Sequence, residues 1–316
     1  MRIAVVSGKG GAGKTTITAS LAAVWNRACV VADADVEAPN AHLFLAPHIA
    51  STEPIYLDVP VLHAEHCTVC GACTSLCRFK AISKLGKKIM VFPDMCHGCG
   101  GCFAVCPEDG ALSHGQRELG VLERGTVQSH SLSEPQAFIM GKARIGEAMT
   151  PPQLRALQGA IDAMVAQNHE ADAIAHFDVI MDAPPGVSCP AMTTVRDVDL
   201  IILAAEPTPF GFHDFMLAHK AFIPLNKKIA VVMNRSGIEG NEAGDQALRD
   251  YCAEHDIPLL AELPFDRQAA EHYAKGQLLV TLSDVWRGRF EDLRDTVQGL
   301  DTIADCKHCE VCPCTK

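Results

Sequence analysis

Apolar residues gather in short runs that alternate with longer amphipathic stretches along most of the chain. A run that is apolar throughout, rather than at every second position, is typical of a strand buried on both faces of a parallel sheet. Such runs, ending in polar residues, lie at 3–7, 30–35, 177–182 and 228–235. Helical stretches are expected at about 14–25, 154–168, 213–222, 241–255 and 284–300. This alternation predicts an α/β fold with a doubly wound, mostly parallel sheet.

Cysteine-rich segments interrupt this pattern. Of the fifteen cysteines, eight lie between Cys67 and Cys106 and four between Cys306 and Cys314. Clusters this dense in a chain of 316 residues indicate metal binding rather than disulfides. We expect an α/β domain in two parts, an inserted domain and a cysteine-rich tail. Their expected boundaries are 1–58 and 115–300 for the α/β domain, 59–114 for the insert, and 301–316 for the tail.

Composition and charge narrow the class of protein. The hydrophobic content of 48% is ordinary for a globular core, and the net charge of −11 argues against a nucleic-acid partner, because phosphate binding needs clustered Lys and Arg. Apolar runs such as 200–205 are far shorter than the roughly 20 residues that span a bilayer. The amino terminus enters a strand directly and leaves no room for a signal peptide. We therefore expect a cytoplasmic protein that binds neither nucleic acid nor membrane.

The loop after the first apolar run has the spacing of a phosphate-binding loop. Gly8, Gly13, Lys14 and Thr15 occupy the fixed places of the pattern G-x-x-x-x-G-K-[ST]. In such loops the main-chain N–H groups close around the phosphates, the lysine neutralises the β- and γ-phosphates, and the hydroxyl reaches Mg²⁺. The start of the following helix adds positive potential. The predicted nucleotide-binding residues of the loop are Gly8, Lys9, Gly10, Gly11, Ala12, Gly13, Lys14, Thr15 and Thr16.

A second lysine makes this loop more specific. With Lys9 in place, Gly-Lys-Gly-Gly-x-Gly-Lys-Thr-Thr resembles the deviant Walker A loop of the MinD, Mrp, ParA and nitrogenase iron-protein class of ATPases. The resemblance implies a Mg²⁺-ATP-dependent dimer, of this chain with itself or with a paralogue, that hydrolyses ATP slowly. It also implies that Lys9 reaches across the dimer interface to the partner's nucleotide. A solvated loop lysine is the alternative interpretation.

Later segments resemble the same class in the same order. Asp35 matches the acid that positions the attacking water, and Asp33 is implied to lie near the metal. Asp182-Ala-Pro-Pro-Gly186 resembles the second switch, whose aspartate holds Mg²⁺ through water and whose glycine amide senses the γ-phosphate. Contacts with the base are implied for Asn234, Pro264 and Asp266. The resemblance thus assigns catalysis to Lys9, Lys14 and Asp35, and magnesium to Thr15, Asp33, Asp35 and Asp182.

The eight cysteines of the insert form two runs of equal spacing. Both runs read C-x-x-C-x-x-C-x-x-x-C, starting at Cys67 and at Cys96. This resembles the bacterial ferredoxin with two [4Fe–4S] clusters, in which the fourth cysteine of each run ligates the other cluster. One cluster is then assigned to Cys67, Cys70, Cys73 and Cys106, and the other to Cys77, Cys96, Cys99 and Cys102. Zinc is the rival metal, because C-x-x-C pairs also build zinc sites.

Further cysteines lie outside the insert. The thiols of Cys306, Cys309, Cys312 and Cys314 could bind Zn²⁺, Cu(I) or an iron–sulfur cluster, or form a reduced tail without metal. Cys189 follows Asp182 by seven residues, which is the spacing of a cluster cysteine in the nitrogenase iron protein. The resemblance makes Cys189 a candidate cluster ligand at a dimer interface, and an ordinary core cysteine is the alternative.

Three functions fit these patterns. The first is ATP-gated transfer of low-potential electrons to a partner protein, and the second is the delivery or assembly of an iron–sulfur cluster or metal cofactor. The third is a positioning ATPase of the MinD or ParA kind with a redox-sensing insert. Two ferredoxin-like clusters favour the first, and the terminal cysteines favour the second. The cysteine tail, in place of a basic amphipathic helix, argues against the third.

Overall fold

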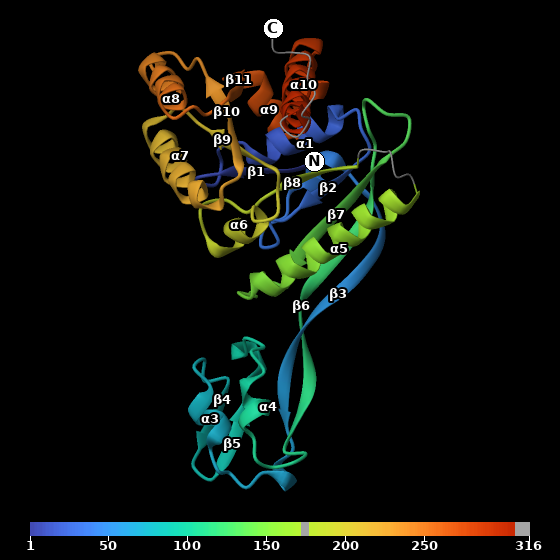
Figure 1. Ribbon diagram of the computed structural model, residues 1–316, viewed down its shortest axis with the longest axis vertical. Helices are drawn as coiled ribbons and strands as arrows, with labels where there is room; N and C mark the ends of the chain where they lie inside the picture. The colour runs from blue at the N-terminus through green and yellow to red at the C-terminus, as the bar shows by residue number, and fades with distance from the viewer. Residues whose placement is uncertain (172–176, 307–316) are drawn as a thin grey trace. The chain divides into compact units, whose positions relative to one another are not determined.

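The computed structural model describes residues 1–171 and 177–306. The chain divides into two compact units, which are described separately. Unit 1 comprises Met1–Thr52, Leu122–Lys142 and Leu154–Lys316, and unit 2 comprises Glu53–Val121 and Ala143–Gln153. Figure 1 labels the helices and strands of both units.

Unit 1 is built on a sheet with the strand order β11-β10-β9-β1-β8-β2-β7-β6-β3. From β11 to β7, all neighbouring strands are parallel. These strands are β1 (Arg2–Ser7), β2 (Cys29–Asp33), β7 (Gln136–Ala143), β8 (Asp178–Asp182), β9 (Leu200–Ala205), β10 (Lys228–Ser236) and β11 (Leu259–Pro264). Two long strands, β3 (His48–Leu62) and β6 (Leu112–Val127), each begin in one unit and end in the other. The predicted α/β fold with a mostly parallel sheet is confirmed.

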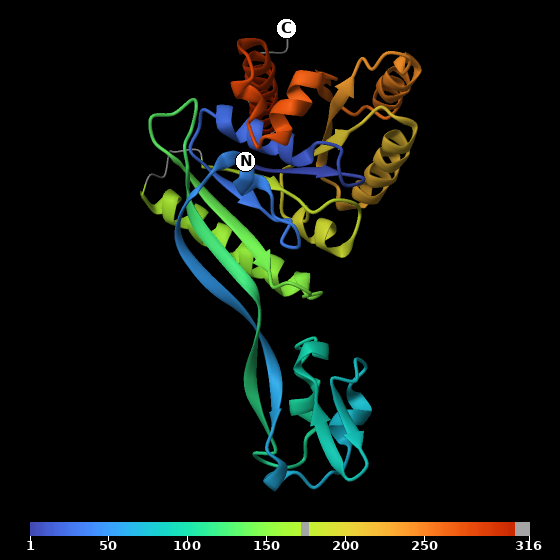
Figure 2. The same cartoon turned by 180° about the vertical axis from the view of Figure 1, so that it is seen from behind.

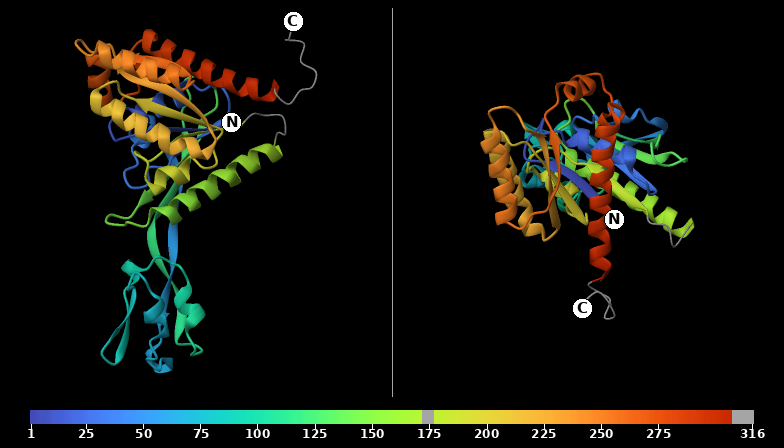
Figure 3. Two further views of the ribbon diagram at one scale, coloured as in Figure 1. Left: turned by 60° about the vertical axis from the view of Figure 1, so that its left-hand side comes forward. Right: turned by 90° about the horizontal axis from the view of Figure 1, so that it is seen from above.

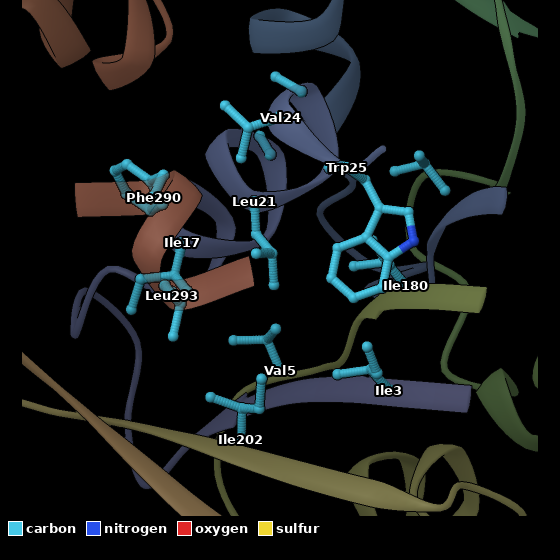
Figure 4. Packing of buried hydrophobic residues seen from close by; sticks show 14 of the residues in the cluster. Ile3, Val5, Ile17, Leu21, Val24, Trp25, Ile180, Ile202, Phe290 and Leu293 are labelled. Carbon is cyan, nitrogen blue, oxygen red and sulfur yellow. The ribbon is translucent and has the colours of Figure 1, made fainter. Parts of the chain in front are cut away.

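The central strands are buried on both faces, as their apolar runs predict. Every residue of β2, β8 and β9 is buried. Figure 4 shows Ile3 and Ile180 pointing toward α1. Phe290 of α10 belongs to the same hydrophobic cluster. The alternate residues Val179 and Met181 lie on the other face of the sheet, beside α5. The core of unit 1 therefore extends over both faces of the sheet, with α1 and α10 on one of them.

Helices accompany the strands in unit 1. They are α1 (Lys14–Val24), α2 (Ala41–Leu45), α5 (Thr150–Ala171), α6 (Cys189–Thr194), α7 (Pro209–Phe222), α8 (Glu242–Glu254), α9 (Arg267–Ala274) and α10 (Asp284–Cys306), with short 3₁₀ turns at Ile223–Leu225 and Leu279–Thr281. Figure 2 shows α5 on the side of the sheet opposite α1, and the right-hand view of Figure 3 shows α10 lying across the α1 side. The predicted helical stretches overlap α1, α5, α7, α8 and α10. The sequence did not predict α2, α6 and α9.

Unit 2 repeats one local structure twice. In each repeat a 3₁₀ turn (Ala64–His66 or Pro93–Met95) precedes the first cysteine of a run, and a short helix (α3, Ala72–Leu76, or α4, Gly101–Val105) carries the third. The residue before each helix, Gly71 or Gly100, has a left-handed backbone, which glycine adopts without strain. Equal cysteine spacing thus gives equal backbone structure in the two runs.

A two-stranded hairpin completes unit 2. β4 (Ile82–Leu85) pairs antiparallel with β5 (Lys88–Val91). Ile82 and Ile89 are buried and pack with Cys73, so one face of the hairpin forms a small core with the first cysteine run. Among the helices that the structure describes, none has the length and apolar character needed to span a membrane.

Candidate functional site: a phosphate-binding loop and two cysteine-lined cavities

The predicted phosphate-binding loop connects β1 to α1. Gly13 precedes the helix with a left-handed backbone (φ 93°), and Lys14 is the first helical residue. From β10, the Nδ2 of Asn234 donates a hydrogen bond of 3.0 Å to the carbonyl of Ala12, so a second strand holds the loop. A cavity of about 340 Å³ opens over the loop. The predicted loop residues that line it are Gly10, Gly11, Gly13, Lys14, Thr15 and Thr16, whereas Gly8, Lys9 and Ala12 are outside the lining.

The loop packs against α7 at Gly8, where there is no room for a side chain. A Cβ on Gly8 would lie 2.1 Å from the main-chain oxygen of Asp214, whereas a Cβ on Gly10 would meet no atom within 4 Å. We expect Gly8→Ala to lower the free energy of unfolding by about 1–3 kcal/mol because the loop must move away from α7. Gly10→Ala should change it by less than about 0.5 kcal/mol. Urea unfolding of the two variants tests this packing, and equal losses would contradict it.

Asp182, at the end of β8, joins the loop in a buried network. Its Oδ1 accepts hydrogen bonds from Lys14 Nζ at 2.7 Å and Thr18 Oγ1 at 3.1 Å, and its Oδ2 accepts one from Thr15 Oγ1 at 2.6 Å. Asp182 is 0% exposed, and Lys14 and Thr15 are also buried. Because β1 and β8 are adjacent parallel strands, their ends meet at one edge of the sheet. This edge therefore combines a phosphate-binding lysine with a hydroxyl and a carboxylate suited to Mg²⁺.

Two carboxylates follow β2, and they have different surroundings. Asp33 accepts hydrogen bonds from the main-chain N–H groups of Asp35, Asn40 and Ala41 at 2.9–3.0 Å. Burial and the nearby charge of Asp182 raise the pKa of Asp33 to about 7. Asp33 thus holds the loop that begins at Asp35, and its predicted place near magnesium stays a prediction.

Asp35 lines the cavity itself. Burial raises the pKa of its carboxyl, while the Lys14 ammonium acts in the opposite direction. A carboxylate with a raised pKa accepts a proton more readily near neutral pH, which suits a group that orients water. The predicted role of Asp35 in orienting water stays a prediction.

The segment after Asp182 crosses the start of the phosphate-binding loop. The Gly186 N–H, predicted to contact the γ-phosphate, here donates a hydrogen bond of 2.8 Å to the carbonyl of Ser7. Pro185 lines the cavity. Cys189 is the exposed first residue of α6 and is outside the cavity lining. Its role as an interface ligand stays a prediction.

Lys9 shares a carboxylate with Arg235. Lys9 Nζ lies 3.9 Å from one oxygen of Glu206, and the guanidinium of Arg235 lies 3.4 Å from the other. The Lys9 side chain is 34% exposed, so Lys9 is not buried with Lys14. Arg235, which the sequence did not single out, also lines the cavity. The two lysines of the loop therefore have different environments, one buried against Asp182 and the other near the surface beside Glu206.

Aromatic side chains form another wall of the cavity. Pro264 and Asp266, predicted to contact the base, line it together with Phe265, Tyr273 and Trp286. Trp286 Nε1 donates a hydrogen bond of 3.1 Å to Asp266, and this bond holds the pKa of the Asp266 carboxyl below its ordinary value. Flat aromatic faces next to a phosphate-binding loop suit a nucleotide base. Sequence reasoning missed Tyr273 and Trp286, because no local pattern marks either residue.

In unit 2, four thiols line one cavity at the first cysteine run. The four are Cys67, Cys70, Cys73 and Cys106, which is the set predicted for one cluster. Burial raises the pKa of Cys73, and the nearby thiols of Cys106, Cys70 and Cys67 raise it further. Apolar side chains, including Leu62 and Ile89, complete the lining. The fourth cysteine of the second run thus lies with the first three of the first run.

The other four thiols line a second cavity. They are Cys77, Cys96, Cys99 and Cys102, again the predicted set. The ring of His97 stacks on Phe79 with 3.5 Å between ring centroids, so the ring faces an aromatic neighbour. Within residues 1–171 and 177–306, no three His, Cys, Asp or Glu side chains converge closely enough to hold a single metal ion. In unit 2, the thiols surround cavities instead of meeting at one point. The metals themselves stay predictions.

The remaining cysteines are either buried in unit 1 or belong to the tail. Cys29 and Cys252 are buried, and burial raises the pKa of Cys252 to about 11, so it is protonated at neutral pH. Cys309, Cys312 and Cys314 lie outside the described residues, and of Cys306 only the helical backbone is described. The third metal site predicted for the tail is therefore outside the part of the chain that carries structural evidence.

Comparison with known proteins identifies relatives of this chain. The family described as the CobQ/CobB/MinD/ParA nucleotide binding domain matches residues 3–280. An uncharacterized protein of Methanocaldococcus jannaschii, MJ0578, is 30% identical over 263 residues, which cover 82% of this chain and 87% of that protein. A second one, MJ0579, is 24% identical over 304 residues and covers 94% and 97%.

Solved structures show the same fold. The septum site-determining protein MinD from Pyrococcus horikoshii, complexed with Mg-ADP, is 18% identical and has a TM-score of 0.52, covering 96% of this chain and 97% of that chain. The McdA(D38A)–ATP complex of Cyanothece is 14% identical with a TM-score of 0.52, covering 94% and 96%. At these identities the likeness extends to the fold and not to the activity.

Proposed function

The chain belongs to the CobQ/CobB/MinD/ParA nucleotide-binding family, and we propose that it is a dimeric Mg²⁺-dependent ATPase that controls an iron–sulfur function. The proposed output is gated transfer of low-potential electrons to a partner protein. One observation carries the proposal: the same chain combines a buried Lys14–Asp182–Thr15 network over a nucleotide-sized cavity with two cavities that are each lined by four cysteines.

The phosphate chemistry follows from the groups around the loop. Lys14 and the main-chain N–H groups of the loop would bind the phosphates, and Thr15 with Asp182 would hold Mg²⁺. Lys14 Nζ is paired with Asp182 at 2.7 Å. The phosphates and Mg²⁺ would compete with this contact for the two side chains. Asp35 would orient the attacking water, and stabilisation of charge on the phosphoryl group would supply most of the catalysis.

Lys9 is proposed to act on the nucleotide of a second copy of the chain. Its contact with Glu206 is long, at 3.9 Å, and its side chain is partly exposed. A surface pair of this kind contributes roughly 0–1 kcal/mol, so releasing Lys9 toward another chain requires little free energy. Hydrolysis would then be slow in the monomer, because one stabilising cation arrives only with the second copy.

The cysteine cavities of unit 2 fit two [4Fe–4S] clusters better than zinc. Each has four thiols, apolar neighbours and a glycine in its lining. The preference for clusters over zinc rests on the two complete C-x-x-C-x-x-C-x-x-x-C runs, because zinc sites need only C-x-x-C pairs. Clusters bound there would take up and release single electrons at low potential. Leu62 and Ile89 would shield one site from water, which is one of the factors that set such potentials.

Cluster or metal delivery is the second candidate function. The four thiols at Cys306, Cys309, Cys312 and Cys314 favour it, since closely spaced terminal thiols can pass a soft metal onward. A Cys306→Ser/Cys309→Ser variant separates the two functions, because delivery requires the tail and gated electron transfer does not.

An anaerobic EPR redox titration of the reconstituted protein, with and without MgATP, tests the proposal. We expect MgATP to shift the midpoint potential or the line shape of at least one cluster signal, because the proposed gating requires nucleotide binding to change the surroundings of a cluster. MgADP is the control and should shift it less. Two ferredoxin-like signals that ignore ATP would contradict gating and favour delivery. The absence of any cluster signal would refute the iron–sulfur assignment.

A further inference from the structure

Unit 2 carries a segregated positive surface in an acidic protein. No carboxylate occurs from residue 66 to residue 93, although the whole chain has a net charge of −11. Unit 2 holds eight carboxylates and seven Lys or Arg residues, so its cations are not in general excess. Five of those seven fall within eleven residues and all five are exposed: Arg78, Lys80, Lys84, Lys87 and Lys88. The positive charge is therefore concentrated on and beside the β4–β5 hairpin.

The outer face of this hairpin carries two exposed apolar side chains and one of the five cations, Lys88. Successive residues of a strand point to opposite faces, and the register pairs Ser83 with Met90 and Leu85 with Lys88. These four residues therefore share the face opposite the buried Ile82 and Ile89. Leu85 is 58% exposed and Met90 is 42% exposed. Figure 1 shows the hairpin beside α3 within unit 2.

The hairpin cations lack acidic partners in the described residues of unit 2. None of the five forms a salt bridge there, and Lys84 Nζ donates a hydrogen bond of 2.9 Å to the carbonyl of Val69. Lysines on a short exposed strand can be explained as protection against edge-to-edge aggregation. That explanation does not account for Leu85 and Met90, because exposed apolar side chains promote the contacts that such lysines prevent.

We propose that the outer face of the β4–β5 hairpin, with Arg78 and Lys80 beside it, is the docking surface for an acidic face of a partner protein. Charge complementarity selects the partner, and Leu85 and Met90 supply the apolar contact at its centre. The hairpin itself lies between this surface and the cysteine cavities, since Ile89 and Ile82 on its inner face line the first and the second cavity. A partner bound here would be separated from the proposed clusters by the hairpin. The redox role of the contact rests on the proposed function, whereas the docking itself does not.

The apolar side chains of the outer face favour a protein partner over a nucleic acid. A nucleic-acid surface gains its affinity from phosphate contacts and from stacking on aromatic side chains. Leu85 and Met90 are aliphatic and share the outer face with Lys88, and apolar contacts beside a charge are typical of a protein interface. Binding of single-stranded DNA is therefore measured beside binding of the acidic probes.

The test measures binding by fluorescence anisotropy with the full-length reconstituted protein. The probes are a labelled acidic flavodoxin, a labelled glutamate- and leucine-rich peptide, and a labelled single-stranded DNA. The hairpin variant is Lys87→Glu/Lys88→Glu. The matched control is Lys220→Glu/Lys275→Glu, which makes the same change in net charge at exposed lysines of unit 1. Leu85→Ser/Met90→Ser tests the apolar contact, and because both residues are exposed it should not impair folding.

We expect the hairpin variant to weaken binding of both acidic probes by at least about tenfold at low ionic strength, and the control to change it by less than about twofold. Leu85→Ser/Met90→Ser should weaken binding at every salt concentration, while binding of the unchanged protein should fall as salt rises. Equal effects of the hairpin variant and the control would overturn the proposal, as would the absence of binding to either acidic probe. Tighter hairpin-dependent binding of DNA would assign the surface to nucleic acid. None of these results depends on EPR signals, so docking and redox gating can fail separately.

Discussion

Replacing Lys14 with methionine is expected to abolish measurable ATP turnover and also to destabilise the nucleotide-free protein. Lys14 Nζ lies 2.7 Å from Asp182, which is 0% exposed, and Asp33 is equally buried. Removing one partner of a buried ion pair leaves the other charge without compensation, which costs about 3–5 kcal/mol. The loss of a cation aimed at the phosphates should lower turnover by about 10²–10³-fold. Urea unfolding without nucleotide and a phosphate-release assay measure the two effects.

The pH dependence of this destabilisation identifies its cause. The Lys14 ammonium lowers the pKa of Asp33, which is nevertheless about 7 because of burial and Asp182. Without Lys14, that pKa rises further above the unfolded value of about 3.9, so the folded variant binds protons more tightly than the unfolded chain. The part of the stability loss that comes from Asp33 should therefore be complete only above the raised pKa of the variant, and it should disappear as the pH falls through about 7, because below that pH Asp33 is protonated in both folded proteins. A loss that is independent of pH would indicate a packing defect and not an uncompensated charge.

Lys9→Met is the matched control in the same loop. Lys9 is partly exposed and 3.9 Å from Glu206, so its removal should change the free energy of unfolding by less than about 1 kcal/mol. The proposed action on a second copy predicts that Lys9→Met still binds ATP but loses hydrolysis. Unchanged turnover in Lys9→Met would refute the assignment in trans without affecting that of Lys14.

The loop and its magnesium residues could be predicted because their chemistry is local in sequence. Gly13, Lys14 and Thr15 are consecutive, and Asp182 follows an apolar run that can only be a buried strand. In a parallel sheet, the ends of such strands meet at one edge. The sequence alone therefore predicted that Asp182 lies at the loop, but it did not predict the direct pairing of Asp182 with Lys14.

Other features depend on contacts between distant segments, and these could not be predicted. Trp286 reaches the cavity because α10 packs on the α1 face of the sheet, and no spacing relates it to the loop. Glu206 holds Lys9 only because β9 lies beside β1. The long strands β3 and β6 escaped prediction for another reason. Many of their residues are exposed, so they lack the continuous apolar runs that mark β1 and β8.

Serine replacements in pairs should show which cysteines share a cluster, and the effect is large because a whole cluster is lost or kept. The structure places Cys106 with Cys67, Cys70 and Cys73, and places Cys77 with the second run. Cys67→Ser/Cys106→Ser then damages only one site, whereas Cys67→Ser/Cys77→Ser damages both. If each run instead held its own cluster, the two double variants would exchange their outcomes.

Iron content distinguishes the two arrangements. Two [4Fe–4S] clusters contain about eight iron atoms, so Cys67→Ser/Cys106→Ser should retain about four and Cys67→Ser/Cys77→Ser about none. Metal bound by the terminal cysteines would add equally to both variants and leave the difference unchanged. EPR of the first variant should show one remaining cluster signal. Equal iron in the two variants would contradict a crossed pairing, because one changed cysteine is common to both and only the second distinguishes them.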